Sequence, residues 1–272
     1  MDTYEVFDEI QDVISILDAD ECPEIHRYFE AIMNDDETVT EDPYEVASHL
    51  LLLDRPDPLP PVVRELIIEL FQAAFESGNP EAMNDLGAQY YDGSRGFEQD
   101  FGKAVEYYDI AAQSGSRQAQ ENLGYCYYYG RNMPVDYEKA FHYFALGAFD
   151  GHLISLYKIA DMYANGYYVQ KNEKEAFLIY DHCASMMTDE AAKFVAGPVF
   201  LRLGKCFLNG IGTEADAETA LICYQKAEVF LFDMVKRGDV MYKKSLKAAI
   251  DGQAKAREKL AKDLPQDAWK FE

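Results

Sequence analysis

Basic side chains are scarce in this sequence. Its 272 residues include 25 Lys and Arg against 49 Asp and Glu, which gives a formal net charge of -24. The excess is concentrated in residues 1–100, where 26 acidic residues face 4 basic ones. Contact with a nucleic-acid backbone needs clustered Lys and Arg, so the composition argues against nucleic acid as a partner. The acidic surface either keeps the protein in solution or attracts a basic partner.

Long apolar runs and paired cysteines are lacking as well. The longest apolar stretches, such as residues 229–232, are far too short to span a bilayer. Residues 1–5 have neither the basic nor the apolar segment of a secretory signal, so we expect a cytoplasmic location and no membrane. The cysteines are odd in number and irregularly spaced, which favours buried thiols in a reducing compartment. They are Cys22, Cys126, Cys183, Cys206 and Cys223.

The sequence also lacks the common fingerprints of enzymes and metal sites. It contains no GxSxG, HExxH, CxxC, phosphate-binding or dinucleotide-binding motif. The acidic residues at 18–21 and 35–37 do not follow the frame of a calcium-binding loop. Asp181, His182 and Cys183 are adjacent on an expected helix and point in different directions, so they cannot share one metal. We therefore predict no enzymatic activity, no cofactor and no metal.

What the sequence does contain is an internal repeat. The block at residues 82–93 recurs at 119–130 with an offset of 37 residues, and parts of it recur near residues 159–166 and 203–210. Each block ends on a glycine and is followed by a second segment with an alanine and, four residues later, an aromatic. These pairs are Ala104 with Tyr108, Ala140 with Phe144, Ala176 with Tyr180, and Ala220 with Tyr224.

The spacing within each copy predicts two helices that pack on one another. Ala82, Leu86 and Tyr90 lie at i, i+4 and i+8, which forms one apolar stripe along a helix. The small residue Gly87 allows a second helix to approach closely, and the glycine that ends each block suits a left-handed C-cap. Because one pair cannot bury its stripe alone, successive pairs must stack. The sequence therefore predicts an all-α solenoid of antiparallel helix pairs.

These residues resemble the Sel-one-like repeat family, whose pattern is roughly A…LG..Y..G, a loop, and KA..Y/W…AA..G. The resemblance covers residues 79–187, and residues 194–232 with one longer insertion. It implies a right-handed α/α superhelix of the tetratricopeptide type. It also implies that the chain is a scaffold or adaptor that binds a protein or peptide, with the first helix of each pair on the concave face.

The repeat divides the expected architecture into three parts. We expect an N-terminal helical cap or subdomain at 1–61, repeats at 62–235 with a degenerate half-repeat at 62–78, and a C-terminal capping helix and tail at 236–272. Outside the repeats, helices are expected near residues 3–18, 23–33, 43–54 and 239–262. The step to the fourth copy is 44 residues, so about eight residues are added near 186–194 to a helix or loop. Pro198 is expected near the start of the following helix, where proline is tolerated.

The candidate binding residues flank the core stripe of each first helix, on the predicted concave face. They are Asn84, Tyr91, Glu121, Tyr125, Tyr128, Tyr157, Asp161 and Lys205. The repeat pattern does not require the four tyrosines, and tyrosine is enriched at interfaces. The alternative is that they pack between neighbouring repeats. As a surface, they would suit an extended peptide with some basic character.

Two other functions compete with partner binding. Some members of the resembled family bind or hydrolyse β-lactams, but those carry a cysteine pair in each repeat. Here only Cys206 and Cys223 could face each other, so the hypothesis of such an enzyme is less favoured than that of a binding protein. The third reading is a structural homo-oligomer assembled through an end cap. We expect a monomer or a weak dimer.

Overall fold

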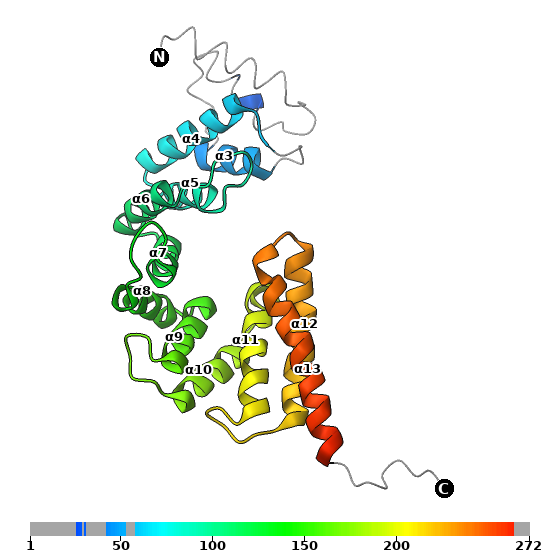
Figure 1. Cartoon of the computed structure of the whole chain (residues 1–272). Coiled ribbons are helices and arrows are strands. Elements are labelled where there is room, and N and C mark those ends of the chain that lie inside the picture. The colour runs from blue at the N-terminus through cyan, green and yellow to red at the C-terminus, as the bar shows by residue number, and fades with distance from the viewer. Residues whose placement is uncertain (1–25, 29, 31–41, 53–57, 264–272) are drawn as a thin grey trace. The chain divides into compact units, whose positions relative to one another are not determined.

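The computed structural model describes residues 26–28, 30, 42–52 and 58–263 (Figure 1). The regular structure in these ranges is entirely helical. Contacts divide the chain into two compact units, Met1–Asp136 and Tyr137–Glu272, which are described separately below. Most of the helices expected near 3–18 and 23–33 lie outside the described residues. The helix expected near 43–54 is confirmed by α3.

The first unit pairs consecutive helices around a buried apolar core. Its helices are α3 (Pro43–Leu52), α4 (Pro61–Glu76), α5 (Glu81–Asp92), α6 (Phe101–Gln113) and α7 (Arg117–Tyr129). Helix α3 packs on α4, α5 packs on α6, and α7 contacts both α5 and α6. Leu50, Ile67, Phe71 and Leu86 are fully buried, and α4 contacts α5, so the residues ahead of the repeats pack against the first repeat.

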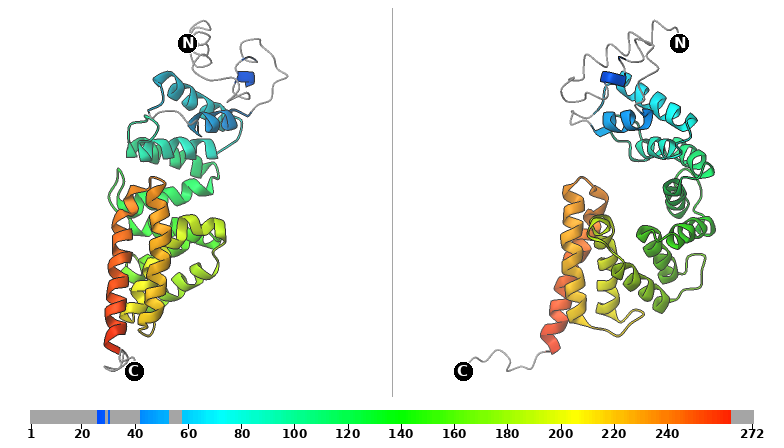
Figure 2. Two further views of the ribbon diagram at one scale, coloured as in Figure 1. Left: turned by 90° about the vertical axis from the view of Figure 1, so that its right-hand side faces the viewer. Right: turned by 180° about the vertical axis from the view of Figure 1, so that it is seen from behind.

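The second unit continues the same pattern with longer helices at its end. Its helices are α8 (Tyr137–Phe149), α9 (Leu153–Asn165), α10 (Glu173–Ser185), α11 (Asp189–Asn209), α12 (Ala217–Lys236), a 3₁₀ turn (Val240–Tyr242) and α13 (Lys243–Asp263). Helices α12 and α13, coloured from amber to red, run side by side in both views (Figure 2). The helix expected at 239–262 is thus a short 3₁₀ turn followed by α13.

Polar side chains and glycines set the helix ends, and of these the sequence predicts the glycines. The left-handed glycines Gly93, Gly130, Gly166 and Gly210 end α5, α7, α9 and α11 with φ between 65° and 73°. The second helices α6, α10 and α12 begin at Asp100, Asn172 and Asp216, whose side chains accept hydrogen bonds from the first backbone N–H groups. These caps satisfy helix-end groups that would otherwise have no partner.

Small residues let the two helices of a pair come close together. A Cβ atom added at Gly87 on α5 would lie 2.8 Å from the ring of Tyr108 on α6. A Cβ added at Gly204 on α11 would lie 2.9 Å from the ring of Tyr224 on α12. Real Cβ contacts are longer, so at both positions the aromatic ring occupies the space that a side chain would need. The predicted role of the small residue is therefore confirmed.

The added residues before the fourth copy lengthen a helix. As a result, the position predicted for Pro198 is wrong. Helix α11 has 21 residues, whereas its counterpart α5 has 12. The extension places Pro198 inside α11, not near its start. An interior proline removes one backbone hydrogen bond and typically costs about 3 kcal/mol. Pro198 is itself buried in α11, which packs extensively against α12.

Two loop residues, Arg95 and Tyr168, have a backbone conformation that their side chains disfavour. The second residue after each helix-ending glycine has positive φ: 55° at Arg95, 58° at Asn132, 64° at Tyr168 and 71° at Gly212. Glycine and asparagine tolerate this region, but a bulky residue there is strained. Tyr168 is also 57% exposed, so little packing offsets the strain.

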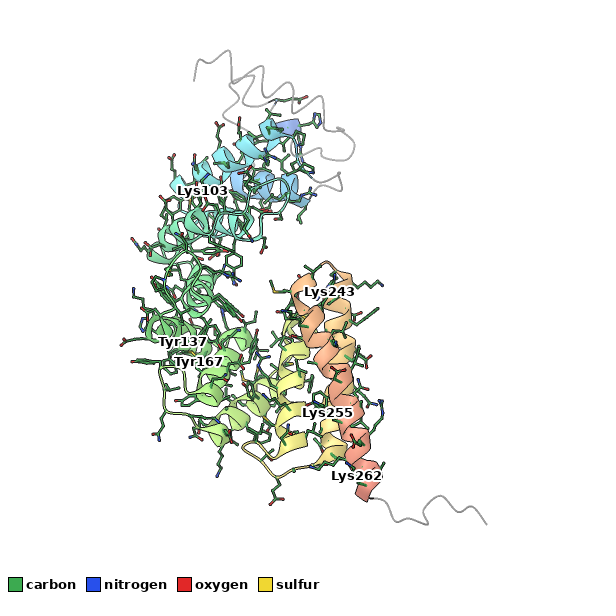
Figure 3. All side chains as sticks on the ribbon, viewed as in Figure 1. Lys103, Tyr137, Tyr167, Lys243, Lys255 and Lys262 are labelled. Atoms are coloured by element: carbon green, nitrogen blue, oxygen red, sulfur yellow. The ribbon has the colours of Figure 1, made fainter. Side chains whose placement is uncertain are left out.

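We expect Tyr168→Asn to raise the free energy of unfolding by about 1 kcal/mol, because asparagine adopts a left-handed backbone more readily. The substitution gives up a tilted ring contact with Phe141 at 5.6 Å and a hydrogen bond of 3.4 Å from the Tyr168 hydroxyl to Glu138, and we expect the relief of strain to exceed both at so exposed a site. Urea denaturation followed by circular dichroism measures the change. Tyr167→Asn is the matched control: its ring stacks on Tyr137 at 4.3 Å (Figure 3), so this variant should be destabilised. A loss of stability in Tyr168→Asn would contradict the strain argument.

Candidate functional site

Two of the predicted binding residues are buried within the first unit. Asn84 is 4% exposed, and its Oδ1 accepts a hydrogen bond of 2.9 Å from Nδ2 of Asn122, which joins α5 to α7. Asn84 Nδ2 donates to Asp85 at 3.1 Å, and the Tyr44 hydroxyl of α3 donates to the same carboxylate at 2.8 Å. Glu121 on α7 is 3% exposed. These polar groups therefore link three helices in the interior.

The other three predicted residues of this unit meet near the C-terminal end of α7. Tyr91, Tyr125 and Tyr128 are partly exposed, and Tyr129 brings two of them together. Tyr125 stacks on Tyr129 with ring centroids 6.1 Å apart, and Tyr128 meets Tyr129 edge-on at 4.9 Å. Tyr129 exposes 48% of its surface. Three of the predicted residues therefore lie close to Tyr129, a more exposed tyrosine that the sequence analysis did not select.

Arg131 joins Tyr91 to this cluster. Its guanidinium carbon lies 4.7 Å from the ring centre of Phe101, 5.8 Å from that of Tyr129 and 5.9 Å from that of Tyr91. Its Nε also donates to the Tyr91 hydroxyl at 3.4 Å. Burial raises the pKa of Tyr91, and the nearby guanidinium opposes that shift. We call Tyr91, Phe101, Tyr125, Tyr128, Tyr129 and Arg131 the α7 aromatic cluster.

In the second unit, Asp161 lies in a buried ion pair instead of on an open surface. It is 7% exposed and accepts hydrogen bonds from Arg202 Nε at 2.5 Å and Nη2 at 2.6 Å. The Tyr180 hydroxyl donates to it at 2.5 Å. Tyr157 is 4% exposed, and the Arg202 guanidinium lies 5.0 Å from its ring centre. These contacts join α9, α10 and α11.

The charges of this buried group shift one another's pKa values. Burial raises the pKa of Asp161, but Arg202, Lys158 and the Tyr180 hydroxyl together hold it below its ordinary value. Burial and the Arg202 charge lower the pKa of Lys158 to about 8, although Asp161 opposes them. The Asp161 carboxylate thus accepts two hydrogen bonds from Arg202 and a third from Tyr180, which satisfies its buried charge. The ion pair therefore fixes α9, α10 and α11 to one another.

The eight predicted residues therefore fall into three groups. Asn84, Glu121, Tyr157 and Asp161 are buried, whereas Tyr91, Tyr125 and Tyr128 lie in the α7 aromatic cluster. Lys205 is exposed on α11 of the second unit. Contact between any of them and a partner stays a prediction. Sequence reasoning missed Arg131 and Arg202; the available signal was that each is an arginine in a strongly acidic chain.

The described cysteines are buried thiols. Cys126, Cys183, Cys206 and Cys223 are unbonded, and burial raises the pKa of each thiol, to about 11 or 12. Cys206 and Cys223 belong to one core cluster, whereas Cys22 lies outside the described residues. Across the described ranges, no three His, Cys, Asp or Glu side chains gather as metal ligands would. None of the helices in those ranges combines the length and the apolar character of a membrane span.

Comparison with known proteins supports the repeat and the fold. The family model described as the Sel1 repeat matches residues 80–116, 117–152, 153–180 and 201–228. The crystal structure of a Sel1 repeat protein from Oxalobacter formigenes has a TM-score of 0.55 and 22% identity, over 68% of this chain and 71% of that one. No curated protein matches the sequence.

A second solved structure is c5321, a protective antigen of uropathogenic Escherichia coli strains that displays an SLR fold. It has a TM-score of 0.56 and 18% identity, over 94% of this chain. This chain spans 57% of the length of that one. At such identities the likeness shows the fold alone. The predicted all-α helical-repeat solenoid and the resemblance to the Sel-one-like repeats are both confirmed.

Proposed function

Because this chain carries four tandem Sel1 repeats and is thus a Sel1 repeat protein, we propose that it binds a protein or peptide as a scaffold or adaptor. The α7 aromatic cluster is the main contact surface. Within the first unit, we assign the contact to the face formed by α5, the start of α6, α7 and the turn that follows α7. The protein acts in the cytoplasm as a binding module and not as an enzyme.

The observation that carries this proposal is the composition of the cluster. It places four tyrosines, a phenylalanine and an arginine together, with Tyr129 about half exposed. Tyrosine and arginine are enriched among the residues that dominate binding energy at interfaces. Tyrosine also supplies a large contact area at a low entropic cost, because its side chain has few rotatable bonds.

One of the buried predicted residues, Asn84, helps to hold the helix that carries this surface in place. Asn84 ties α5 to α7 through Asn122, so it helps to fix the helix that bears Tyr125, Tyr128 and Tyr129. A contact surface whose side chains are held in place loses less conformational entropy on binding. Lys205, exposed on α11, remains a predicted contact of the second unit.

Alanine substitutions at the cluster test the proposal. We expect Tyr129→Ala, and the double variant Tyr125→Ala/Tyr128→Ala, to reduce partner capture from a native lysate by about tenfold or more, as loss of an interface hot spot does. Recovered partner is quantified by mass spectrometry. Phe149→Ala is the matched control, since Phe149 is 92% exposed at the end of α8 and outside the cluster. If the cluster variants keep their helical circular dichroism and still capture the same partners in full, the proposal is wrong.

A further inference from the structure

We infer that Arg131 anchors a carboxylate of the bound segment, so that the ligand of the α7 aromatic cluster is acidic where it meets this residue. This inference rests on the proposed function and specifies its ligand. It is supported by the donors that Arg131 leaves unused, by the aromatic rings that hold it, and by the charge balance of the chain.

Arg131 keeps terminal donors available. A guanidinium has five N–H groups, and only Nε is engaged, in a long hydrogen bond of 3.4 Å to the Tyr91 hydroxyl. Among the residues that the structure describes, no oxygen accepts from Nη1 or Nη2 of Arg131, and no carboxylate pairs with it. In contrast, Arg202 uses Nε and Nη2 on Asp161 and Nη1 on the Pro198 carbonyl. Arg131 therefore retains the donors that a planar oxyanion requires.

The surrounding rings determine how Arg131 can be used. Phe101, Tyr91 and Tyr129 all have ring centres within 6 Å of the guanidinium carbon. Rings attract a guanidinium at their faces, and arginine can stack on aromatic groups while it binds a carboxylate through its N–H edge. Because this side chain is already held by contacts, it loses little freedom when a ligand arrives. The geometry therefore points to an oxyanion receptor with apolar walls.

Charge complementarity makes a carboxylate the fitting occupant. With 49 acidic residues in the sequence, carboxylates that could pair with arginine are abundant, yet Arg131 pairs with none of them among the described residues. The exposed Asp92 lies near Tyr91 and opposes an incoming anion. Salt screens charges beyond about 8–10 Å, so the carboxylates that oppose the ligand are the near ones, which are Asp92 and Asp100, the residue before Phe101. Direct contact with Arg131 has to outweigh these two. Asp92 and the net charge reject anions that do not also contact the rings.

A basic ligand has less support at the residues first predicted to attract one. Glu121 is buried, and Asp161 is already neutralised by Arg202 in the other unit. The segment we infer combines a carboxylate with a neighbouring aromatic or aliphatic side chain, which packs on Tyr125 and Tyr129. The carboxylate belongs either to Asp or Glu or to the end of a chain.

Selection from random peptides tests this directly. Short random peptides are displayed on phage in two formats, one with a free C-terminus and one with that end joined to the coat protein, and are selected on the full chain. The enriched pools are then measured on Arg131→Gln, on Tyr129→Ala and on Lys103→Gln. Lys103 is the matched control, because it is a cation 4.7 Å from the Tyr90 ring centre in the same unit (Figure 3).

We expect the pools to be enriched in Asp, Glu or a free C-terminus beside an apolar residue. Their retention should fall about tenfold or more on Arg131→Gln and stay unchanged on Lys103→Gln. Enrichment confined to the free-end format identifies a terminal carboxylate, and enrichment in both formats identifies acidic side chains. A pool rich in Lys and Arg, or one that needs Tyr129 but binds Arg131→Gln normally, overturns the inference and leaves the proposed function standing. If no pool is enriched, the inference fails, and the capture of partners by the alanine variants decides the proposed function separately.

Discussion

Arg202→Met is expected to lower the free energy of unfolding by about 3–5 kcal/mol, the usual cost of removing one partner of a buried ion pair. The variant would leave the Asp161 carboxylate buried with only Tyr180 and Lys158 beside it. It would also remove the hydrogen bond to the Pro198 carbonyl. Urea denaturation followed by circular dichroism measures the change in stability.

The double variant Asp161→Leu/Arg202→Met is the informative control. It removes both charges and should recover most of the stability, because apolar replacements of a buried pair are often neutral. Lys255→Met, at an exposed lysine on α13, should change stability by about 0.5 kcal/mol or less. If Arg202→Met unfolds at the wild-type urea concentration, the ion pair does not fix the second unit.

The same pair predicts how stability depends on pH. The folded pKa of Asp161 lies below its ordinary value, whereas the unfolded chain keeps a pKa of about 3.9. Its contribution is therefore complete above the unfolded pKa and is lost as the pH falls through the folded pKa. The double variant should lose less stability between neutral and acidic pH than the wild type does.

The second large effect is expected at Gly252, where we predict that valine lowers the free energy of unfolding by about 2 kcal/mol or more. A Cβ atom there would lie 2.5 Å from the ring of Tyr224, and that ring is also packed against Gly204 on α11. The ring is therefore held between α11 and α13 and cannot move away. Urea denaturation reports the destabilisation, and amide hydrogen exchange should show faster exchange throughout α13.

Two variants separate overpacking from a change in helix propensity. Ala248→Val, at an exposed position of the same helix, should cost only the small propensity difference of about 0.5 kcal/mol. Adding Tyr224→Leu to Gly252→Ala makes room for the new methyl group, so the pair should be less destabilised than the sum of the single variants. A wild-type stability for Gly252→Val would show that α13 does not pack as described.

The fold could be predicted because its requirements are local. Two helices that approach closely need a small residue, and Gly87 fills this role opposite Tyr108. A left-handed helix end needs a glycine such as Gly130. Both requirements place a particular residue type at a fixed spacing in the sequence, where it can be recognised. The position of Pro198 could not be predicted in this way. Whether added residues extend a helix or form a loop depends on packing, and here the extension of α11 packs against α12.

The site was harder to predict because it depends on contacts between repeats. Positions beside the core stripe were expected to face a partner. Asn84 is instead buried against Asn122, and Asp161 is buried against Arg202, each from a later helix. A single repeat pattern cannot show such pairs, which are separated by 38 and 41 residues. Tyr129 and Arg131 were missed for a related reason, since they lie at the helix end, outside the spacing used to select the face.

The most direct test of partner binding at the α7 aromatic cluster is site-specific photocrosslinking in cells that produce the protein. The crosslinking amino acid p-benzoylphenylalanine replaces Tyr129 in one sample and Phe149 in another; both side chains are exposed, at 48% and 92%. We predict that position 129 gives a discrete adduct with another protein, that Arg131→Gln weakens this adduct, and that position 149 gives none. A discrete adduct at position 149 with none at position 129 would contradict the assignment of the binding surface.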